Sequence, residues 1–170
     1  KSTREVRHCG TQLPCDDKGE PSNRLELITS ANGIAHENAH DALADVTALI
    51  AVTKLIKQKQ PQLYDYLLKM RDKKVVQQLV NVDDKKPFVY ASGRYDKEFA
   101  KTTVAFPLTT SRNGGVVVYD LRYDPTPFVG LNAEELAKKI FASWEERQAE
   151  NFVKLPVKEL QYNRCPAAAP

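Results

Sequence analysis

The chain has 170 residues, of which 42% are hydrophobic and 28% are charged, and its formal net charge is +3. These proportions are typical of a globular protein. No apolar run approaches the ~18 residues that a transmembrane helix needs. The sequence therefore excludes a membrane-spanning helix, and so small a positive charge does not by itself indicate nucleic-acid binding.

The cysteines suggest a cellular compartment, and the single methionine bears on how the chain begins. Cys9, Cys15 and Cys165 are three in number and form no C-x-x-C pair. This suits a reduced compartment better than a disulfide framework. No secretory pattern opens the chain, and the only methionine is Met70. We expect a cytoplasmic protein, and a chain that is a fragment or a processed product.

The first third of the chain reads as helical. Residues 1–21 show no clean period and are expected to be irregular. Ser22 predicts the N-cap of a short helix that Asn32-Gly33 terminates. A long amphipathic helix follows and must end near Pro61, because proline interrupts helical hydrogen bonding.

The remainder begins with two short helical patterns at 63–72 and 74–80. The apolar period then changes to two, which indicates strands. The strand-like segments are 87–93, 102–110, 116–123 and 152–162, with Asn113-Gly114-Gly115 as a hairpin turn and Pro156 interrupting the last segment. Asn132 and Glu135 form a capping box that predicts a helix over 133–144. Residues 165–170 read as a linker.

This change of period predicts two domains, 1–60 and 61–170. The boundary is expected near Gln60-Pro61, or after the two short helices. The fold class is α/β in the broad sense, and α+β in detail, because the helices and the strands are largely segregated along the chain.

Ionisable groups and alanines open the long helix together, in the segment His40 to Val46. Apolar residues after it fall within one arc of a helical wheel and predict a buried stripe, formed by Leu43, Val46, Leu49, Ile50, Thr53 and Ile56. Asp45 lies at the margin of that stripe. A carboxylate at such a margin is either solvated or held for a purpose.

His40 and Asp45 converge only if His40 lies outside the helix. Asp41 makes this possible, because aspartate is a good N-cap. Asp45 then lies near the helix N-terminus, where the dipole favours an ionised carboxylate. Such an oxygen ligand suits Mg²⁺ or Mn²⁺, and an imidazole suits general-base catalysis. Alternatively, Asp41 only caps, Asp45 only complements the dipole and His40 is a loop residue.

Basic residues cluster in the sequence between Lys54 and Lys86, a segment that contains nine lysines and arginines and four aspartates. Clustered cations can attract a polyanion. A solvated helix surface explains the same pattern.

The pattern Leu25-x-x-Ile28, Gly33 and His40-x-Ala42-x-x-Asp45 resembles the third motif of DEDD-type 3′→5′ exonucleases of the histidine subclass. Residues 19–46, 60–74 and 86–93 are in addition similar to the bacterial exonuclease I family, which degrades single-stranded DNA. The resemblance covers nearly the whole chain and is strongest over residues 19–93.

This resemblance implies the helical C-terminal part of a ribonuclease H-like exonuclease domain, followed by a Src-homology-3-like β-barrel. It implies two Mg²⁺ ions, with Mn²⁺ possible, in a cytoplasmic bacterial enzyme of DNA repair and recombination. His40 matches the general base and Asp45 the last metal-binding carboxylate. The family's other three carboxylates precede this chain, and Asp96-x-Glu98 matches their pair only by chance. We therefore expect a fragment that is inactive alone.

The resemblance also suggests two binding surfaces. Single-stranded DNA is expected on the basic and aromatic residues Lys85, Lys86, Arg94, Tyr95, Phe99 and Lys101. The barrel core is expected to take about half of the aromatics Phe88, Tyr90, Tyr95, Phe99 and Phe106. Arg7, Tyr66 and Lys86 match positions that bind the C-terminal tail of single-strand DNA-binding protein. The protein is expected to be monomeric. The alternatives are a non-catalytic DNA- or protein-binding barrel and an RNA-directed exonuclease of the same superfamily.

Overall fold

The computed structural model describes residues 12, 14–37 and 40–170, which form two compact units, Lys1–Lys69 and Met70–Pro170. The units divide nine residues beyond the expected boundary at 60/61, between the two short helices. The first of these helices packs against the long helix before it, and so stays with the first unit.

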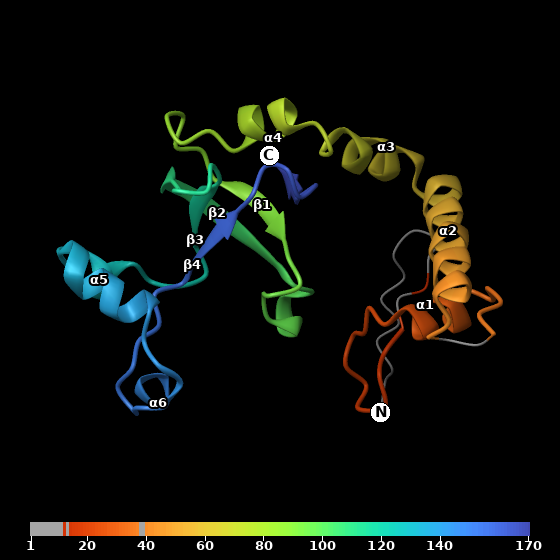
Figure 1. The fold of residues 1–170 in the computed structure, drawn as a ribbon, viewed down its shortest axis with the longest axis horizontal. Helices are drawn as coiled ribbons and strands as arrows, with labels where there is room; N and C mark the ends of the chain where they lie inside the picture. Colours follow the sequence, from red (N-terminus) through yellow and green to blue (C-terminus); the bar gives the residue numbers. More distant parts are fainter. Residues whose placement is uncertain (1–11, 13, 38–39) are drawn as a thin grey trace. The chain divides into compact units, whose positions relative to one another are not determined.

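The described part of the first unit contains three helices: α1 (Leu25–Ala31), α2 (Ala42–Lys59) and α3 (Pro61–Lys69) (Figure 1). The predicted Ser22 N-cap is wrong. Arg24 is the N-cap residue of α1 and makes no side-chain cap, while the Ser22 hydroxyl accepts from the Arg24 backbone N–H at 3.4 Å. Asn32 closes α1 as predicted, and Gly33 follows with φ +65°.

Pro61 ends one helix and begins the next. α2 stops at Lys59, and α3 starts at Pro61 itself. Proline suits the first position of a helix, because no hydrogen bond within the helix needs its missing N–H and its φ is already helical. Among the helices of the described residues, none is both long enough and apolar enough to cross a membrane.

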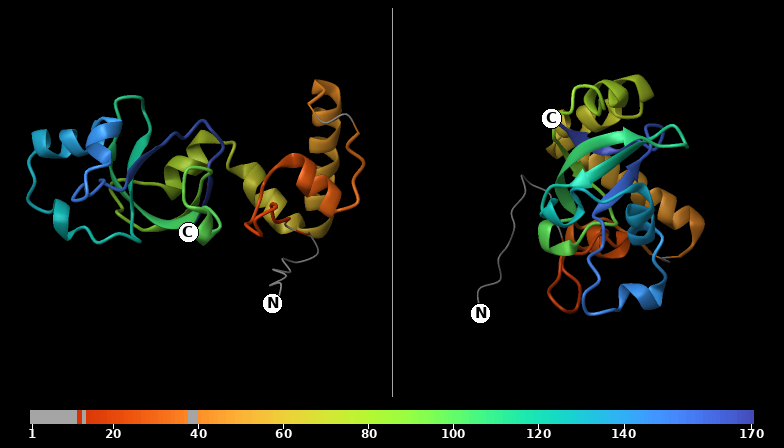
Figure 2. Two further views of the ribbon diagram at one scale, coloured as in Figure 1. Left: turned by 90° about the horizontal axis from the view of Figure 1, so that it is seen from below. Right: turned by 90° about the vertical axis from the view of Figure 1, so that its left-hand side faces the viewer.

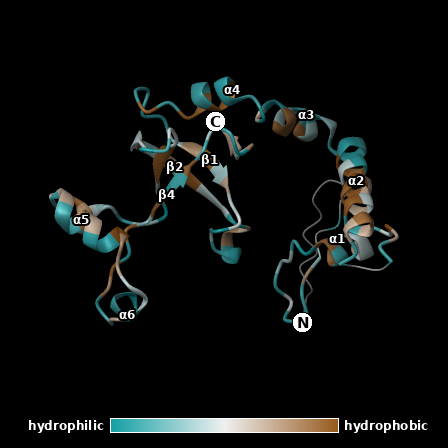
Figure 3. Cartoon of the chain, in the orientation of Figure 1, coloured by the Kyte–Doolittle hydropathy of each residue, from teal (hydrophilic) through white to brown (hydrophobic). Residues whose placement is uncertain are grey.

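The apolar stripe of α2 is not buried, contrary to the prediction. Leu43 is 75% exposed, and Val46, Leu49 and Ile50 are each just over half exposed. Figure 3 colours the hydrophobic residues along α2 brown. α2 contacts α1 and α3 and buries Ala48. The stripe stays exposed because no other layer of the described chain covers it.

The second unit is built on one antiparallel sheet of five strands in the order β4-β3-β2-β1-β5 (Figures 1 and 2). The strands are β1 (Phe88–Ala91), β2 (Thr102–Thr110), β3 (Val116–Asp120), β4 (Val157–Leu160) and β5 (Ala167–Ala169). The prediction of a linker over 165–170 is wrong, because β5 pairs with β1 and places Ala168 opposite Tyr90. Helix α4 (Lys73–Leu79) contacts β5.

The β2–β3 hairpin turns where the sequence predicts. Gly114 has φ +75°, a conformation that glycine adopts without strain. Gly115 is fixed by packing, because a Cβ on it would lie 2.5 Å from the Leu160 carbonyl oxygen. Pro107 is tolerated within β2 because the register of β2 against β3 shifts just after it, and such irregularities accommodate a missing N–H.

The connection from β3 to β4 carries the remaining helices. It contains the 3₁₀ turn η2 (Thr126–Phe128), then α5 (Ala133–Ile140) and α6 (Trp144–Arg147). The Asn132–Glu135 capping box is confirmed. The predicted helix over 133–144 is two helices, because Ser143 opens α6 with a second capping box.

The sheet packs the core of this unit. Its fully buried residues include Val76 of α4 and Val116, Val118 and Leu160 of the sheet. A second cluster joins Tyr119, Phe128 and Leu155. Of the five aromatics in question, Phe88 and Tyr90 are buried, and Phe106 packs on the second cluster. Phe99 is half exposed, so the aromatics divide between core and surface as expected.

Candidate functional site

His40 lies just outside α2, as predicted. Asp41 is the N-cap of α2, and its carboxylate accepts from the backbone N–H groups of Leu43 and Ala44. His40 is exposed and has φ +80°, a left-handed conformation that histidine tolerates better than most residues. Its backbone N–H lies 3.4 Å from Asp45 Oδ1. The backbone of His40 therefore converges on Asp45.

A different histidine supplies the side chain that contacts Asp45. His36 Nε2 lies 2.9 Å from Asp45 Oδ1, and the His36 side chain is only 4% exposed. On the other side of the ring, His36 Nδ1 lies 3.4 Å from the Thr29 hydroxyl. That hydroxyl faces the carbonyl oxygens of Leu25 and Glu26, each at 3.0 Å. A hydroxyl has one proton, so if a carbonyl takes it, the Thr29 oxygen is an acceptor for Nδ1–H.

His36 is therefore a link between the start of α2 and α1. Its Nε2 faces the Asp45 carboxylate, and its Nδ1 faces the Thr29 hydroxyl. The pattern of the histidine and aspartate five residues apart drew attention to His40 and away from His36. The available signal was a second histidine in the same loop, nine residues before Asp45.

The surroundings of Asp45 favour the ionised form of its side chain. The hydrogen bond from His36 lowers the pKa of Asp45 below its ordinary value, and the backbone N–H of His40 and the two histidine charges act in the same direction, against a smaller opposing effect of burial. Both hydrogen bonds use Oδ1. The contacts of the described residues leave Oδ2 open, and the side chain is 40% exposed. An ionised oxygen of this kind can bind a cation.

One carboxylate does not make a metal centre. Within residues 12, 14–37 and 40–170, no three His, Cys, Asp or Glu side chains gather closely enough to hold a metal ion. Asp96 is the N-cap residue of the 3₁₀ turn η1 (Lys97–Phe99) in the second unit, and Glu98 lies within that turn. The described part of the candidate site thus contains one carboxylate, that of Asp45, and one histidine, His36, that orients it.

The predicted DNA-binding residues fall into two groups. Lys85 and Lys86 are exposed and precede β1. The other four, Arg94, Tyr95, Phe99 and Lys101, lie in the connection from β1 to β2, beyond the opposite end of β1. The Lys101 amine donates to the Gly93 carbonyl at 2.9 Å, so it helps to fix that connection. The structure does not bring the two groups together.

Sequence reasoning missed Arg122, around which the second group is organised. Its guanidinium carbon lies 4.7 Å from the ring centre of Phe99, 5.5 Å from that of Tyr95 and 5.9 Å from that of Tyr123. Guanidinium groups bind aromatic faces in this way. The clue was the Asp120-x-Arg122 spacing, because side chains two apart on an extended chain point to the same side.

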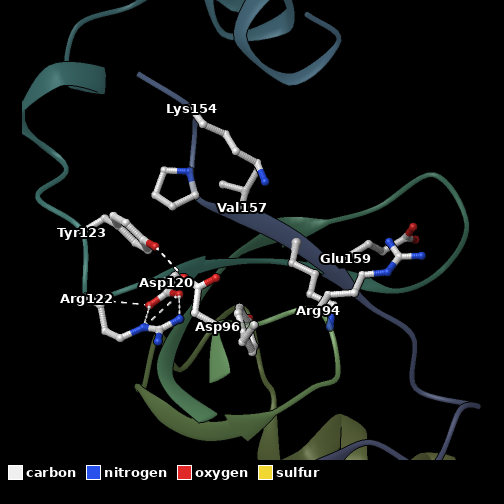
Figure 4. Close-up of a pocket in the computed structure, with 11 residues that line it drawn as sticks. Arg94, Asp96, Asp120, Arg122, Tyr123, Lys154, Val157 and Glu159 are labelled. Atoms are coloured by element: carbon white, nitrogen blue, oxygen red, sulfur yellow. Dashed lines mark hydrogen bonds and ion pairs between the residues drawn. The ribbon is translucent and has the colours of Figure 1, made fainter. Parts of the chain in front are cut away.

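Asp120 holds Arg122 in place. Arg122 Nη2 lies 2.6 Å from Asp120 Oδ2, and Nε lies 3.0 Å from Oδ1 (Figure 4). Thr103 also donates to this carboxylate, which is buried. Burial alone would raise the pKa of Asp120, but the hydrogen bonds from Arg122 and Thr103 outweigh it and lower the pKa. The pair is ionised and directional.

The residues expected to bind a partner tail are less defined. Arg7 lies outside the described residues. Tyr66 belongs to the first unit and is partly buried, and this burial raises its pKa. Lys86 belongs to the second unit and is exposed.

Comparison with known proteins finds one family model, the exonuclease I SH3-like domain, which matches residues 71–170. Exodeoxyribonuclease I of Haemophilus influenzae is 40% identical over 168 residues, which are 97% of this chain and 35% of that protein. Exodeoxyribonuclease I of Escherichia coli is 38% identical over 166 residues, which are 96% and 34%. The chain spans about a third of the length of these relatives.

Solved structures agree. Exonuclease I from Methylocaldum szegediense superposes with a TM-score of 0.89 at 39% identity, over 99% of this chain and 36% of that one. E. coli exonuclease I with a dA16 oligonucleotide superposes with a TM-score of 0.88 at 38% identity, over 97% of this chain and 35% of that one. The E. coli complex with SSB-Ct superposes with a TM-score of 0.84 at 36% identity, again over 97% of this chain and 35% of that one. Similarity of this extent in sequence and fold shows that the chain belongs to the exonuclease I family, with residues 71–170 forming its SH3-like domain.

Proposed function

We propose that this chain is part of a 3′→5′ exodeoxyribonuclease that degrades single-stranded DNA to mononucleotides. The carrying observation is its 38% identity to an E. coli enzyme whose structure is solved with a DNA oligonucleotide. The ionised, partly exposed Asp45 beside the backbone of His40 adds local support, because both residues match the family's third motif.

In this proposal Asp45 is a metal ligand and His40 is the general base. Oδ1 of Asp45 is held by His36, so Oδ2 is the atom that remains to bind a cation. His40 directly precedes Asp41, the N-cap of α2, and is exposed, so its ring is accessible to a water molecule. A positioned base of this type contributes about 10²–10⁴-fold to a rate.

The metal-binding role requires further ligands. A pair of divalent cations, Mg²⁺ in our proposal, would generate the nucleophile from water and neutralise charge on the leaving oxygen. Asp45 fits one position of such a site in charge and in access. In this proposal the other carboxylates come from sequence outside this chain, as the resemblance implies, and the described residues contain no group of three ligands. A zinc-bound E. coli exonuclease I–DNA complex, at 35% identity to this chain, favours a metal site in the family.

The second unit is proposed to hold the DNA strand and the first to carry the chemistry. Arg94, Tyr95 and Phe99 supply cationic and aromatic groups, and Lys85 and Lys86 supply exposed charge. Arg7, Tyr66 and Lys86 are proposed to bind the SSB tail, which the E. coli complex with SSB-Ct favours. A role in DNA repair and recombination in the bacterial cytoplasm follows from the same proposal.

The first experiment compares two lengths of protein. The 170-residue chain is incubated with single-stranded DNA and Mg²⁺, beside a full-length nuclease that contains it. We expect mononucleotide release from the full-length protein only. Release from the 170-residue chain above a heat-treated control would contradict the incomplete metal site. A full-length protein that degrades RNA in preference to DNA would support the RNA-directed alternative.

The second experiment changes the two proposed residues in the full-length protein. Asp45→Asn should nearly abolish activity, because it removes the charge that binds metal. Asp41→Asn is the matched control, since it removes a neighbouring charge while asparagine still caps α2. His40→Ala should lower kcat by about 10²–10⁴-fold and flatten the fall in rate at acid pH, where a histidine base is protonated. Normal activity and an unchanged pH profile in His40→Ala would refute its role. Full activity in both variants would mean that catalysis does not depend on Asp45 or His40, and would favour the alternative that this chain is a non-catalytic module.

A further inference from the structure

His36 is buried in a loop whose neighbouring residues are exposed. Its side chain is only 4% exposed, whereas Ala35 and Glu37 on either side of it are exposed. A histidine that turns inward from a surface loop needs partners for its ring nitrogens, because a buried polar group without a partner costs free energy. The structure supplies one partner on each side of the ring, and the two partners belong to different helices.

Thr29 fixes the loop on the side of α1. This residue is 1% exposed, and its backbone carbonyl accepts from the Ile34 N–H at 2.9 Å. Its hydroxyl lies 3.4 Å from Nδ1 of His36. One buried residue of α1 therefore contacts the loop twice, once through the backbone and once at the histidine ring. These contacts limit how far the ring can turn.

The other side of the His36 ring meets the Asp45 carboxylate. Nε2 lies 2.9 Å from Asp45 Oδ1. An ionised carboxylate only accepts hydrogen bonds, so Nε2–H is the donor. The backbone N–H of His40 also points to Oδ1, but at the longer distance of 3.4 Å. His36 thus makes the shorter of the two hydrogen bonds to Asp45, and it does so from a ring that is itself held.

These hydrogen bonds determine how the Asp45 carboxylate is turned. The Asp45 side chain is 40% exposed, and the last torsion of an aspartate side chain is soft, so packing alone does not fix it. Two donors on Oδ1 oppose its rotation and leave Oδ2 open among the described residues. A cation binds more tightly to an oxygen that is already in place, because less conformational freedom is lost on binding.

We propose that His36 is a positioning residue of the metal site, whose Nε2–H holds Oδ1 of Asp45 so that Oδ2 is presented to a divalent cation. The inference rests on the proposed function, in which Asp45 is a metal ligand. His36 acts only through Asp45 and contacts neither the metal nor the DNA. Hydrogen-bond partners of metal ligands typically contribute about 10–100-fold to metal affinity or activity.

The test measures the Kd for Mn²⁺ of a full-length nuclease that contains this chain, without DNA, by electron paramagnetic resonance. Two amide variants separate the two sides of the ring. In His36→Gln the amide nitrogen reaches about as far as Nε2 and can donate to Asp45. In His36→Asn the amide reaches only as far as Nδ1, on the side of Thr29. We expect His36→Gln to bind Mn²⁺ nearly as tightly as the wild type, and His36→Asn to bind it about 10–100-fold more weakly.

The same variants are assayed for mononucleotide release from single-stranded DNA across Mg²⁺ concentrations. His36→Asn should need about 10–100-fold more Mg²⁺ for its half-maximal rate and approach the wild-type rate at saturation, because the Asp45 ligand is misplaced but not removed. His36→Leu fills the space of the ring without a donor, and it takes the place of His36→Asn, with the same expected loss, if that variant does not fold.

Equal Mn²⁺ affinities for His36→Gln and the variant without a donor to Asp45 would overturn the proposal. So would weaker binding by His36→Gln than by that variant, because the link to Thr29 would then matter more than the bond to Asp45. The wild-type full-length protein tests the proposed function separately. If it degrades single-stranded DNA while the variants bind Mn²⁺ equally, the role of His36 fails and the nuclease function stands. If it degrades none, the proposed function itself fails.

Discussion

Val116, Val118 and Leu160 in the sheet of the second unit are fully buried, whereas Leu43, Val46 and Leu49 on α2 are each more than half exposed. Both sets are aliphatic and follow the period of their own element. The difference lies in what covers them. Val116 and Val118 lie on β3, which pairs with β2 on one side and with β4 on the other, while in the described structure α2 packs mainly against α1 and α3. Local pattern decides which face is apolar, and the rest of the fold decides whether that face is buried.

This contrast separates the two proposed roles. The second unit encloses its own core, so it should keep its structure without further chain. The described part of the first unit carries Asp45 and His40, but it contains no group of three metal-binding side chains and leaves the apolar stripe of α2 exposed. In the proposed full-length nuclease, one layer of structure would supply both the metal-binding partners and a cover for α2.

Leu160→Ala should produce the largest loss of stability. The side chain is completely buried, and removing such a leucine costs about 2–5 kcal/mol through lost transfer free energy and a residual cavity. Chemical denaturation of the second unit, followed by the fluorescence of Trp144, measures the change. A loss below about 0.5 kcal/mol, the usual range for a surface substitution, would mean that the sheet core is loosely packed.

Asp120 should make the stability of the second unit depend on acid. Its pKa is lowered on folding, so its contribution is complete above its ordinary pKa of 3.8 and is lost as the pH falls through the folded value. Hydrogen bonds to a charged group contribute about 1.5–3 kcal/mol. Asp120→Asn should lower the melting temperature at pH 7 and reduce its fall below pH 4. Asp83→Asn, at an exposed carboxylate, is the control, and an acid profile in Asp120→Asn like that of the control would count against the ion pair.

Much of the fold follows from local sequence. The period-two segments became β1, β2, β3 and β4 because alternation alone defines one buried face of a strand. Asn132 and Asp41 cap helices because their side chains need only the next turn of backbone. β5 escaped prediction because Ala167–Ala169 has no alternation, and its pairing with β1 depends on residues 76 or more positions away.

The candidate site was predicted in part for the same reason. Asp45 and the loop position of His40 followed from spacing and resemblance. His36 was missed because its contacts with Asp45 and Thr29 depend on how the loop folds back over α1. The cluster around Arg122 joins two connections that are distant in sequence, and the local Asp120-x-Arg122 spacing indicates the ion pair but not the aromatic rings that gather on it.

Helix caps allow a like-for-like comparison of the two units. Asn132→Ala removes the capping box of α5, and Asp41→Ala removes the cap of α2. Each change should cost about 0.5–2 kcal/mol of local stability. Because α5 contributes to the cluster of Tyr119, its loss should be felt across the second unit. Hydrogen exchange should show faster exchange confined to the first unit for Asp41→Ala, and an equal effect in both units would break the separation.

Leu49→Ala should have the smallest effect in this chain and is the most informative about α2. Leu49 is 53% exposed, so truncating it removes little buried area, and we expect a loss within about 0.5 kcal/mol, as for most surface substitutions. In a full-length nuclease that contains this chain, the same change should cost about 2–5 kcal/mol, because the apolar stripe would then face a packed layer. The ratio of the two losses measures how much of that face is covered. Val104→Ala, at a 46% exposed position on β2, is the control in the second unit. Losses for Leu49→Ala that are equally small in both proteins would mean that the stripe of α2 is a solvent-facing surface in the whole enzyme as well.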